Sequence, residues 1–273
     1  MKNIFIEGLQ GMGKSFLTQK ISEQFPELCV CREGDYSPVE LAWCTWMTKE
    51  EYEGILEEYA ALEDLKKEIA ANTVLEGTHY IVCYTKILTE IPGFHKNLEQ
   101  YEIYNGRKTL QELEEIILSR YSQFSGTGYV SECAWMQNIL EELLLYFQLS
   151  DDEILAFYRR LYNAVQREHF LLLYLYSDRI EETIRIIQKE RADAAGNQLW
   201  YELMMSYFTS SPYGQAHGCT EFEELVMHFA HRQRLELRII KEIIRENACI
   251  LPAKQWDMGQ ITDWLLRNGL RKE

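Results

Sequence analysis

The sequence predicts an α/β fold with a largely parallel central sheet, helices on both of its faces and a large, mainly helical insertion. Two observations predict the sheet. Short runs typical of buried strands alternate with segments whose apolar positions have helical spacing, and the first run enters a glycine-rich loop that leads into a helix. A third observation predicts the insertion, because residues 36–125 are mostly helical in their periodicity.

Composition bounds the class of protein. The chain has 273 residues, of which 47% are hydrophobic, so one domain over residues 1–273 can bury a core without disulfides or metal. The net charge of −15 disfavours a nucleic-acid partner. No apolar run is long enough to cross a membrane, so no membrane partner is expected.

The seven cysteines, an odd number, fit a reduced compartment better than a disulfide framework. The start of the chain is too short and too soon acidic for a signal peptide. We therefore expect a cytoplasmic protein whose partner is a small molecule, and we leave open whether it forms a homodimer.

The first elements follow from local pattern. Residues 3–7 are expected to form a buried strand and residues 14–24 a helix. Residues 28–32 look like a second strand, which ends at the acidic turn Glu33-Gly34-Asp35-Tyr36. Expected strands and helices then continue through the insertion and beyond it.

Within the insertion, the apolar spacing predicts helices over residues 50–69 and 109–124. A β-branched and aromatic segment, residues 78–87, is expected to pair with residues 100–104. After the insertion we expect, in order, a strand over 128–132, helices over 136–149 and from 150, a strand over 169–176, a helix over 180–191, an irregular segment over 205–220, a helix over 221–247, a strand over 248–251 and a helix over 260–267.

The glycine-rich loop matches the phosphate-binding pattern Gly-x-x-x-x-Gly-Lys-Ser in full. Glycines let main-chain N–H groups turn toward a phosphate, and the following helix offers its positive end. Lys14 is expected to reach the β- and γ-phosphates, and Ser15 to give a hydroxyl to Mg²⁺. ATP and Mg²⁺ are thus the expected ligands. The residues expected to contact the nucleotide here are Gly8, Gly11, Met12, Gly13, Lys14, Ser15 and Phe16.

Other classes of nucleotide-binding protein carry further motifs that this sequence lacks. It has no Asn-Lys-x-Asp segment for reading guanine, no Leu-Ser-Gly-Gly signature, and no Asp-Glu pair at the end of a strand. What remains is a kinase that acts on a small molecule.

Four segments carry a resemblance: Phe5 to Ser15, Arg32-Glu33-Gly34, Tyr129 to Glu132, and Tyr174 to Arg191. In these segments the chain resembles the P-loop nucleoside and nucleotide kinases of the thymidylate kinase and deoxynucleoside kinase group. The resemblance implies a three-layer α/β/α domain of the P-loop NTPase type with sheet order 2-3-1-4-5. It implies transfer of the ATP γ-phosphate to a nucleoside or nucleotide. The long insertion, 36–125, is expected to form the acceptor pocket.

The resemblance also implies roles for acidic residues. Glu33 matches the carboxylate that takes the proton of the acceptor hydroxyl. Because Gly34 stands where those kinases carry proline, Asp35 is a rival for this role, and an ordinary solvated turn is the alternative. Glu132 matches the residue that helps to hold Mg²⁺, although Cys133 follows it where the kinases have arginine.

Basic residues of the helix over 180–191 match the lid of those kinases, whose arginines neutralise charge on the transferred phosphoryl group. Arg191 and Arg185 are the favoured candidates, with Lys189 third, and a basic surface stripe is the alternative. Ala253 and Lys254, after the last strand, match the loop that packs on adenine. Two other functions stay open: a non-enzymatic ATP-binding regulatory module and a plain ATP hydrolase.

Overall fold

A computed structural model describes residues 1–271 of the chain. The chain divides into two compact units. The first unit comprises Met1–Val30 and the residues from Ser125 onward, and the second comprises Cys31–Phe124. The bounds of the second unit lie close to those of the predicted insertion.

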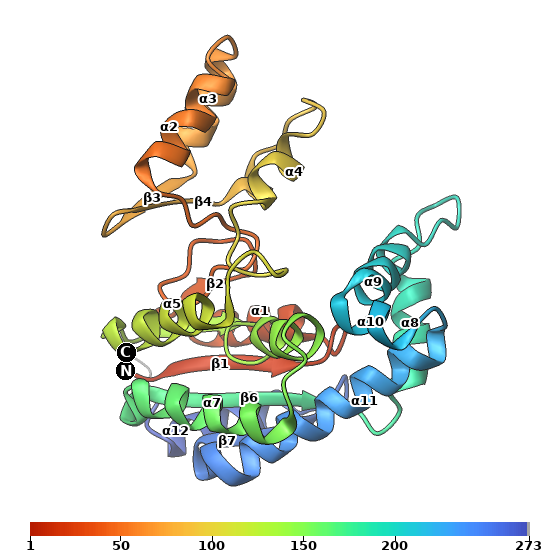
Figure 1. Cartoon of the computed structure of the whole chain (residues 1–273). Helices are drawn as coiled ribbons and strands as arrows, with labels where there is room; N and C mark the ends of the chain where they lie inside the picture. The colour runs from red at the N-terminus through yellow and green to blue at the C-terminus, as the bar shows by residue number, and fades with distance from the viewer. Residues whose placement is uncertain (272–273) are drawn as a thin grey trace. The chain divides into compact units, whose positions relative to one another are not determined.

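The central sheet has five strands in the order β2-β5-β1-β6-β7 (Figure 1). Strand β1 is central and pairs in parallel with both β5 and β6, and β7 pairs in parallel with β6. The strands are β1 (Asn3–Gly8), β2 (Cys29–Cys31), β5 (Tyr129–Glu132), β6 (Phe170–Tyr176) and β7 (Ala248–Pro252). The labels differ from the predicted 2-3-1-4-5 because β3 and β4 form a separate hairpin. Among the sheet's own strands, the order is the second, third, first, fourth and fifth along the chain.

Side chains of β1 alternate between two apolar layers, as the period of a strand requires. Ile4 and Ile6 belong to a buried cluster that also contains Leu17 of the first helix. Phe5 points to the other layer, where its ring lies 4.8 Å from that of Phe170 and 5.9 Å from that of Trp135. Helices therefore cover both faces of the sheet, as the near-continuous apolar run in β6 predicts.

The helices of the first unit follow the strands of the sheet. They are α1 (Lys14–Gln24), α6 (Gln137–Glu141), α7 (Asp151–Ala164), α8 (Ile180–Glu190), α9 (Leu199–Ser210), α10 (Pro212–His217), α11 (Phe222–Ile239) and α12 (Met258–Arg267), with π-helical turns over Glu142–Tyr146 and Ile240–Ile244 and 3₁₀ turns over Arg167–His169 and Arg245–Asn247. The capping box predicted at the start of α7 is confirmed, since the Ser150 hydroxyl accepts the N–H of Glu153.

The irregular segment predicted over 205–220 is wrong, because α9 and α10 occupy most of it. Ser211 and Pro212 are the reason. The Ser211 hydroxyl accepts the N–H of Gly214, and Pro212 stands at the start of α10. There its fixed φ favours a helix and its missing N–H costs nothing.

The second unit comprises α2 (Lys49–Glu58), α3 (Glu63–Ala71), β3 (Thr73–Glu76), β4 (His79–Val82), a 3₁₀ turn over Tyr84–Lys86, α4 (Phe94–Glu99) and α5 (Leu110–Gln123). The predicted pairing of 78–87 with 100–104 is wrong, since β4 pairs with β3 in antiparallel fashion. Gly77, with φ of 60°, makes the tight turn between them. The single helix predicted over 50–69 is also wrong, since it is split into α2 and α3.

None of the helices within residues 1–271 combines the length and the apolar character needed to cross a bilayer.

Candidate functional site

The glycine loop, Gly8 to Ser15, joins the end of β1 to the start of α1. Gly8, Gly11 and Gly13 all have positive φ, at 140°, 75° and 92°. A Cβ at Gly8 would lie 2.3 Å from the carbonyl oxygen of Leu175, and one at Gly11 would lie 1.8 Å from Cδ1 of Ile187. Glycine is therefore required at these two positions both by conformation and by space.

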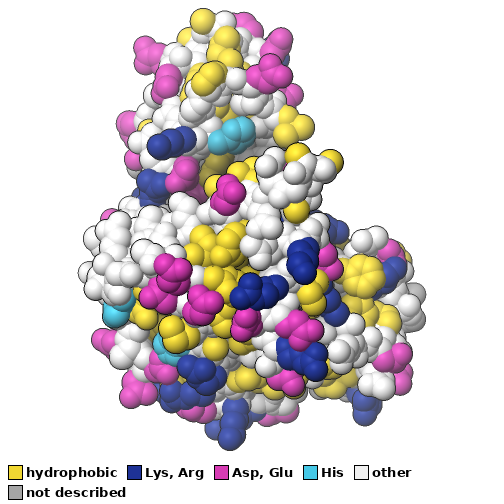
Figure 2. All heavy atoms as spheres, turned by 90° about the vertical axis from the view of Figure 1, so that its right-hand side faces the viewer, with side chains coloured by type: hydrophobic (Ala, Val, Ile, Leu, Met, Phe, Trp, Pro, Cys, Tyr) yellow, Lys and Arg dark blue, Asp and Glu magenta, His cyan; other side chains and the backbone are white. Residues whose placement is uncertain are grey.

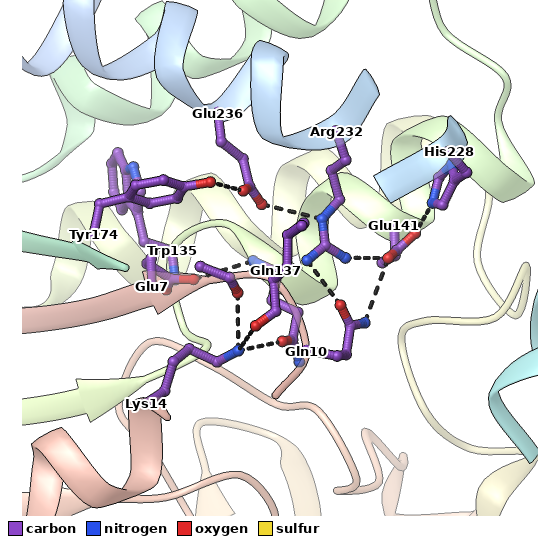
Figure 3. A network of polar contacts seen from close by, with 12 residues as sticks. Glu7, Gln10, Lys14, Trp135, Gln137, Glu141, Tyr174, His228, Arg232 and Glu236 are labelled. Atoms are coloured by element: carbon purple, nitrogen blue, oxygen red, sulfur yellow. Dashed lines mark hydrogen bonds and ion pairs between the residues drawn. The ribbon is translucent and has the colours of Figure 1, made fainter. Parts of the chain in front are cut away.

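Lys14 is buried inside the loop, with 7% of its surface exposed. Its ammonium donates to the carbonyl oxygens of Gly8 and Leu9 and to Oε1 of Gln137, each at 2.8 Å (Figure 3). An ammonium has three N–H donors, so these acceptors satisfy it. The loop thus encloses a positive charge among main-chain groups.

Glu7 fastens the segment after β5 to β1. Its carboxyl group is fully buried and accepts the N–H of Trp135 at 2.5 Å and that of Gln137 at 3.2 Å. Burial raises the pKa of Glu7 to about 8, although these N–H groups and the charge of Lys14 act to lower it. Glu7 therefore holds the main chain of Gln137 in place, and with it the amide that meets Lys14.

A second buried cluster contacts the glycine loop through Gln10 (Figure 3). Arg232 of α11 donates from Nη2 to Oε1 of Gln10 at 2.9 Å and from Nη1 to Glu141. Its Nε lies 3.1 Å from Glu236, and Nε2 of His228 lies 2.6 Å from Glu141. The cluster ties the loop to α6 and α11.

The two carboxyl groups of this cluster, Glu141 and Glu236, have pKa values shifted in opposite directions. Burial alone would raise the pKa of Glu141, but Arg232 and His228 lower it to about 2. Burial raises the pKa of Glu236, against the effect of Arg232. Glu141 is thus the carboxylate whose charge compensates the buried Arg232. Leaving that buried charge uncompensated would cost stability.

Oxygen donors suited to Mg²⁺ stand at the carboxyl end of β5 and the start of α1. Glu132 is buried at 7% exposure, and Oε2 accepts a hydrogen bond from Oγ1 of Thr18 at 3.3 Å. Ser15, three residues before Thr18 on α1 and so its neighbour, is exposed. A carboxylate and a hydroxyl beside phosphate oxygens make a donor set that Mg²⁺ accepts. Between Met1 and Arg271 there is no group of three or more His, Cys, Asp and Glu side chains placed for a metal.

The predicted lid residues lie on different faces of α8. Ile187 packs on Gly11, and Arg191, four residues later, shares its face. Arg191 lies over the ring of Trp200, with 4.8 Å between the guanidinium carbon and the ring centroid. Arg185 and Lys189 are each two residues from Ile187 and so point to the opposite side.

Arg185 and Lys189 line a hollow of about 720 Å³ between α8 and α11. Arg185 bonds there to Glu181 at 3.0 Å and lies 4.3 Å from the ring centroid of Phe222. On the face drawn in Figure 2, acidic and basic side chains intermingle. The positions of Arg185 and Lys189 fit the alternative stated above, a basic surface stripe.

The segment after β7 brings aromatic groups beside α1. The N–H of Ala253 donates to the carbonyl of Tyr176 at 2.8 Å, and Lys254 pairs with Glu190 at 3.2 Å. The ring of Trp256 lies 5.8 Å from that of Phe16, which is 56% exposed. A flat ring could stack on the exposed ring of Phe16.

The candidate base residues belong to the second unit. Asp35 is engaged, since its carboxylate accepts from Lys86 at 2.7 Å and from the N–H of Arg32 at 3.1 Å. Glu33 is exposed. Gly34 has φ of 83°, which proline cannot adopt. The departure from the Glu-Pro pattern is therefore built into the conformation of this turn.

Buried carboxyl groups of the second unit were not predicted as site residues. Burial raises the pKa of both Glu40 and Glu102 to about 7. Tyr104 donates to Glu40 at 3.2 Å and Tyr84 to Glu102 at 2.5 Å. Aromatic residues of the second unit pack in its apolar core, as in the stacked pair Tyr52 and Tyr80.

Sequence reasoning also missed the polar residues around Lys14. A signal was present, because Gln137 and Glu141 are four residues apart in a strongly apolar segment. Arg232 and Glu236 have the same spacing in α11. Polar residues one turn apart on an apolar helix indicate a buried network.

No protein-family model matches the chain, and no curated protein is significantly similar to it.

Proposed function

We propose that the chain is a P-loop phosphotransferase that binds Mg-ATP at the glycine loop and moves the γ-phosphate to a small hydroxylated or phosphorylated acceptor. The observation that carries the proposal is the buried ammonium of Lys14, enclosed by a loop in which Gly8 and Gly11 admit no side chain. Main-chain N–H groups, the start of α1 and a lysine are the elements that bind a polyphosphate.

Further features support the proposal. The glycine loop lies at the carboxyl ends of parallel strands, where ligands of such sheets bind. Counting only the strands of the central sheet, their order supports a likeness to nucleoside and nucleotide kinases. Phe16 and Trp256 offer a surface for adenine. A nucleoside or nucleotide is the acceptor class that this likeness favours.

Residues can be assigned to the steps of phosphoryl transfer. Lys14 and the loop would bind the phosphates, and Ser15 with Glu132 would hold Mg²⁺, which offsets phosphate charge. Arg191 would meet the charge that develops on the transferred group. Glu33 or Asp35 would take the acceptor proton, and Asp35 is the one that Lys86 contacts.

The test is ADP release from Mg-ATP with and without a panel of nucleosides, nucleotides and other phosphorylatable small molecules. One class should stimulate release, and Lys14→Ala should lower the stimulated rate by about 100-fold or more. Lys241→Ala is the control, because Lys241 is an exposed lysine in the π-helical turn over Ile240–Ile244.

Other results would point elsewhere. Steady ADP release that no acceptor stimulates would identify a hydrolase. Binding of ATP without any release would favour the non-enzymatic module and overturn the phosphotransferase.

A further inference from the structure

The three acceptors that hold Lys14 differ in how readily they can be exchanged. Each lies 2.8 Å from Nζ, and together they use its three N–H donors. A phosphate oxygen can therefore bond to Lys14 only if one of them is released. Nucleotide binding must include an exchange of partners at this ammonium.

Two of the acceptors are fixed by the main chain. Gly8 is the last residue of β1 and lies in register with Leu175 of β6. The Leu9 carbonyl also accepts the N–H of Met12 at 3.4 Å. Releasing either carbonyl would require the loop backbone to move. The third acceptor, Oε1 of Gln137, sits on side-chain torsions that can rotate between staggered wells.

The main chain of Gln137 is nevertheless anchored. Its N–H donates to Glu7 at 3.2 Å, beside the 2.5 Å bond from Trp135 to the same carboxyl group. Glu7 directly precedes Gly8 in β1, so this strand holds the main-chain N–H of Gln137 in place. Of the three acceptors, Oε1 of Gln137 is the one that can move away from Lys14 without a change in the main chain.

We infer that Gln137 competes with the nucleotide's β- and γ-phosphates for Lys14, and that its neutral amide sets the affinity for Mg-ATP. The inference rests on the proposed function. An amide satisfies the buried ammonium before nucleotide arrives, yet it carries no charge that would hold the ammonium back or repel phosphate. A carboxylate at this position would do both.

The experiment compares Gln137→Leu and Gln137→Glu with the wild type. The dissociation constant for Mg-ATP is measured by calorimetry at one pH and one ionic strength. Leucine removes the competitor and should tighten binding several-fold, up to about tenfold. Glutamate should weaken binding by about tenfold or more, because it pairs with Lys14 and repels phosphate. Shifts in opposite directions are the signature of competition.

The matched controls are Gln111→Leu and Gln111→Glu, at an exposed position of α5, which should stay within about twofold of the wild type. A merely structural role of Gln137 predicts that both Gln137 variants weaken binding or that neither changes it, and either result overturns the inference. Thermal unfolding without nucleotide shows whether each variant folds.

If Gln137→Glu does not fold, the leucine variant decides alone, and unchanged or weaker binding overturns the inference. If the wild type does not bind Mg-ATP, both the proposed function and the inference are overturned. Wild-type binding with shifts in one direction overturns the inference alone.

Discussion

Glu7 is a carboxyl group in a place that favours its neutral form. It is fully buried, and burial raises its pKa from the ordinary value of 4.5 to about 8. The folded protein therefore binds a proton at Glu7 over a range where the unfolded chain has lost it. Stability from this group is fully present below about pH 4.5 and falls as the pH rises toward 8.

Glu7→Gln should remove this part of the pH dependence. The amide keeps only one acceptor oxygen for the two N–H groups, so below about pH 4.5 the variant should be less stable than the wild type by roughly 1–3 kcal/mol. That offset should shrink between about pH 4.5 and 8, by at most about 1.4 kcal/mol per pH unit. Urea unfolding at several pH values measures the difference.

Glu40 and Glu102 also titrate in the folded state with raised pKa values of about 7. They are present in both proteins, so their effect cancels in the difference. An offset that does not change with pH would show that Glu7 is ionised throughout and would contradict the prediction.

At the scale of single residues, the sequence could predict where the backbone conformation requires glycine, but it could not predict contacts between distant side chains. The glycine positions follow from the pattern alone, and the structure gives Gly8 and Gly11 no room for a Cβ. The contact between Lys14 and Gln137 joins residues far apart in the chain. Arg232 meets Gln10 at a still larger separation, and local spacing carries no information on such pairs.

At the scale of elements, the basic residues of α8 lie on different faces of the helix. Ile187 packs on Gly11, so a residue on the same face, Arg191, belongs to the side near the glycine loop. Arg185 points away and already pairs with Glu181. The two arginines should therefore differ in their effect on the proposed reaction.

Arg191→Ala should lower kcat of the stimulated reaction by about 10- to 100-fold, as expected when a cation that meets developing charge is lost. Arg185→Ala should change kcat by less than about threefold, because an exposed ion pair contributes little. Steady-state kinetics with the stimulating acceptor compares the two. Equal losses, or a larger loss for Arg185, would contradict the assignment.

The elements that sequence reasoning missed share a cause. Apolar spacing predicted one helix over 50–69 because both α2 and α3 carry inward apolar residues, and it could not show that the chain turns between Glu58 and Glu63. Ser211-Pro212, within the segment predicted to be irregular, starts α10 instead. Turn and cap residues are ambiguous until the neighbouring chain is placed.

At the scale of the molecule, the parallel sheet was predictable because buried strands and amphipathic helices alternate along most of the chain. The second unit was predictable in extent but not in content. Its hairpin depends on the turn at Gly77, which gives β4 the partner β3 rather than the segment predicted. Strand pairing is set by turn geometry and burial together, and the sequence shows neither directly.

The proposed function also predicts how ligand changes the stability of the whole protein. A ligand that binds only the folded state stabilises it by RT ln(1 + [L]/Kd), which is about 2.7 kcal/mol at 100 times Kd. Mg-ATP should raise the unfolding temperature accordingly, and Lys14→Ala should abolish most of the rise. Hydrogen exchange should show the gain in protection in the glycine loop and α1. An equal rise for Lys14→Ala would mean that ATP binds elsewhere, because the buried ammonium of Lys14 is the charge that the loop offers to phosphate.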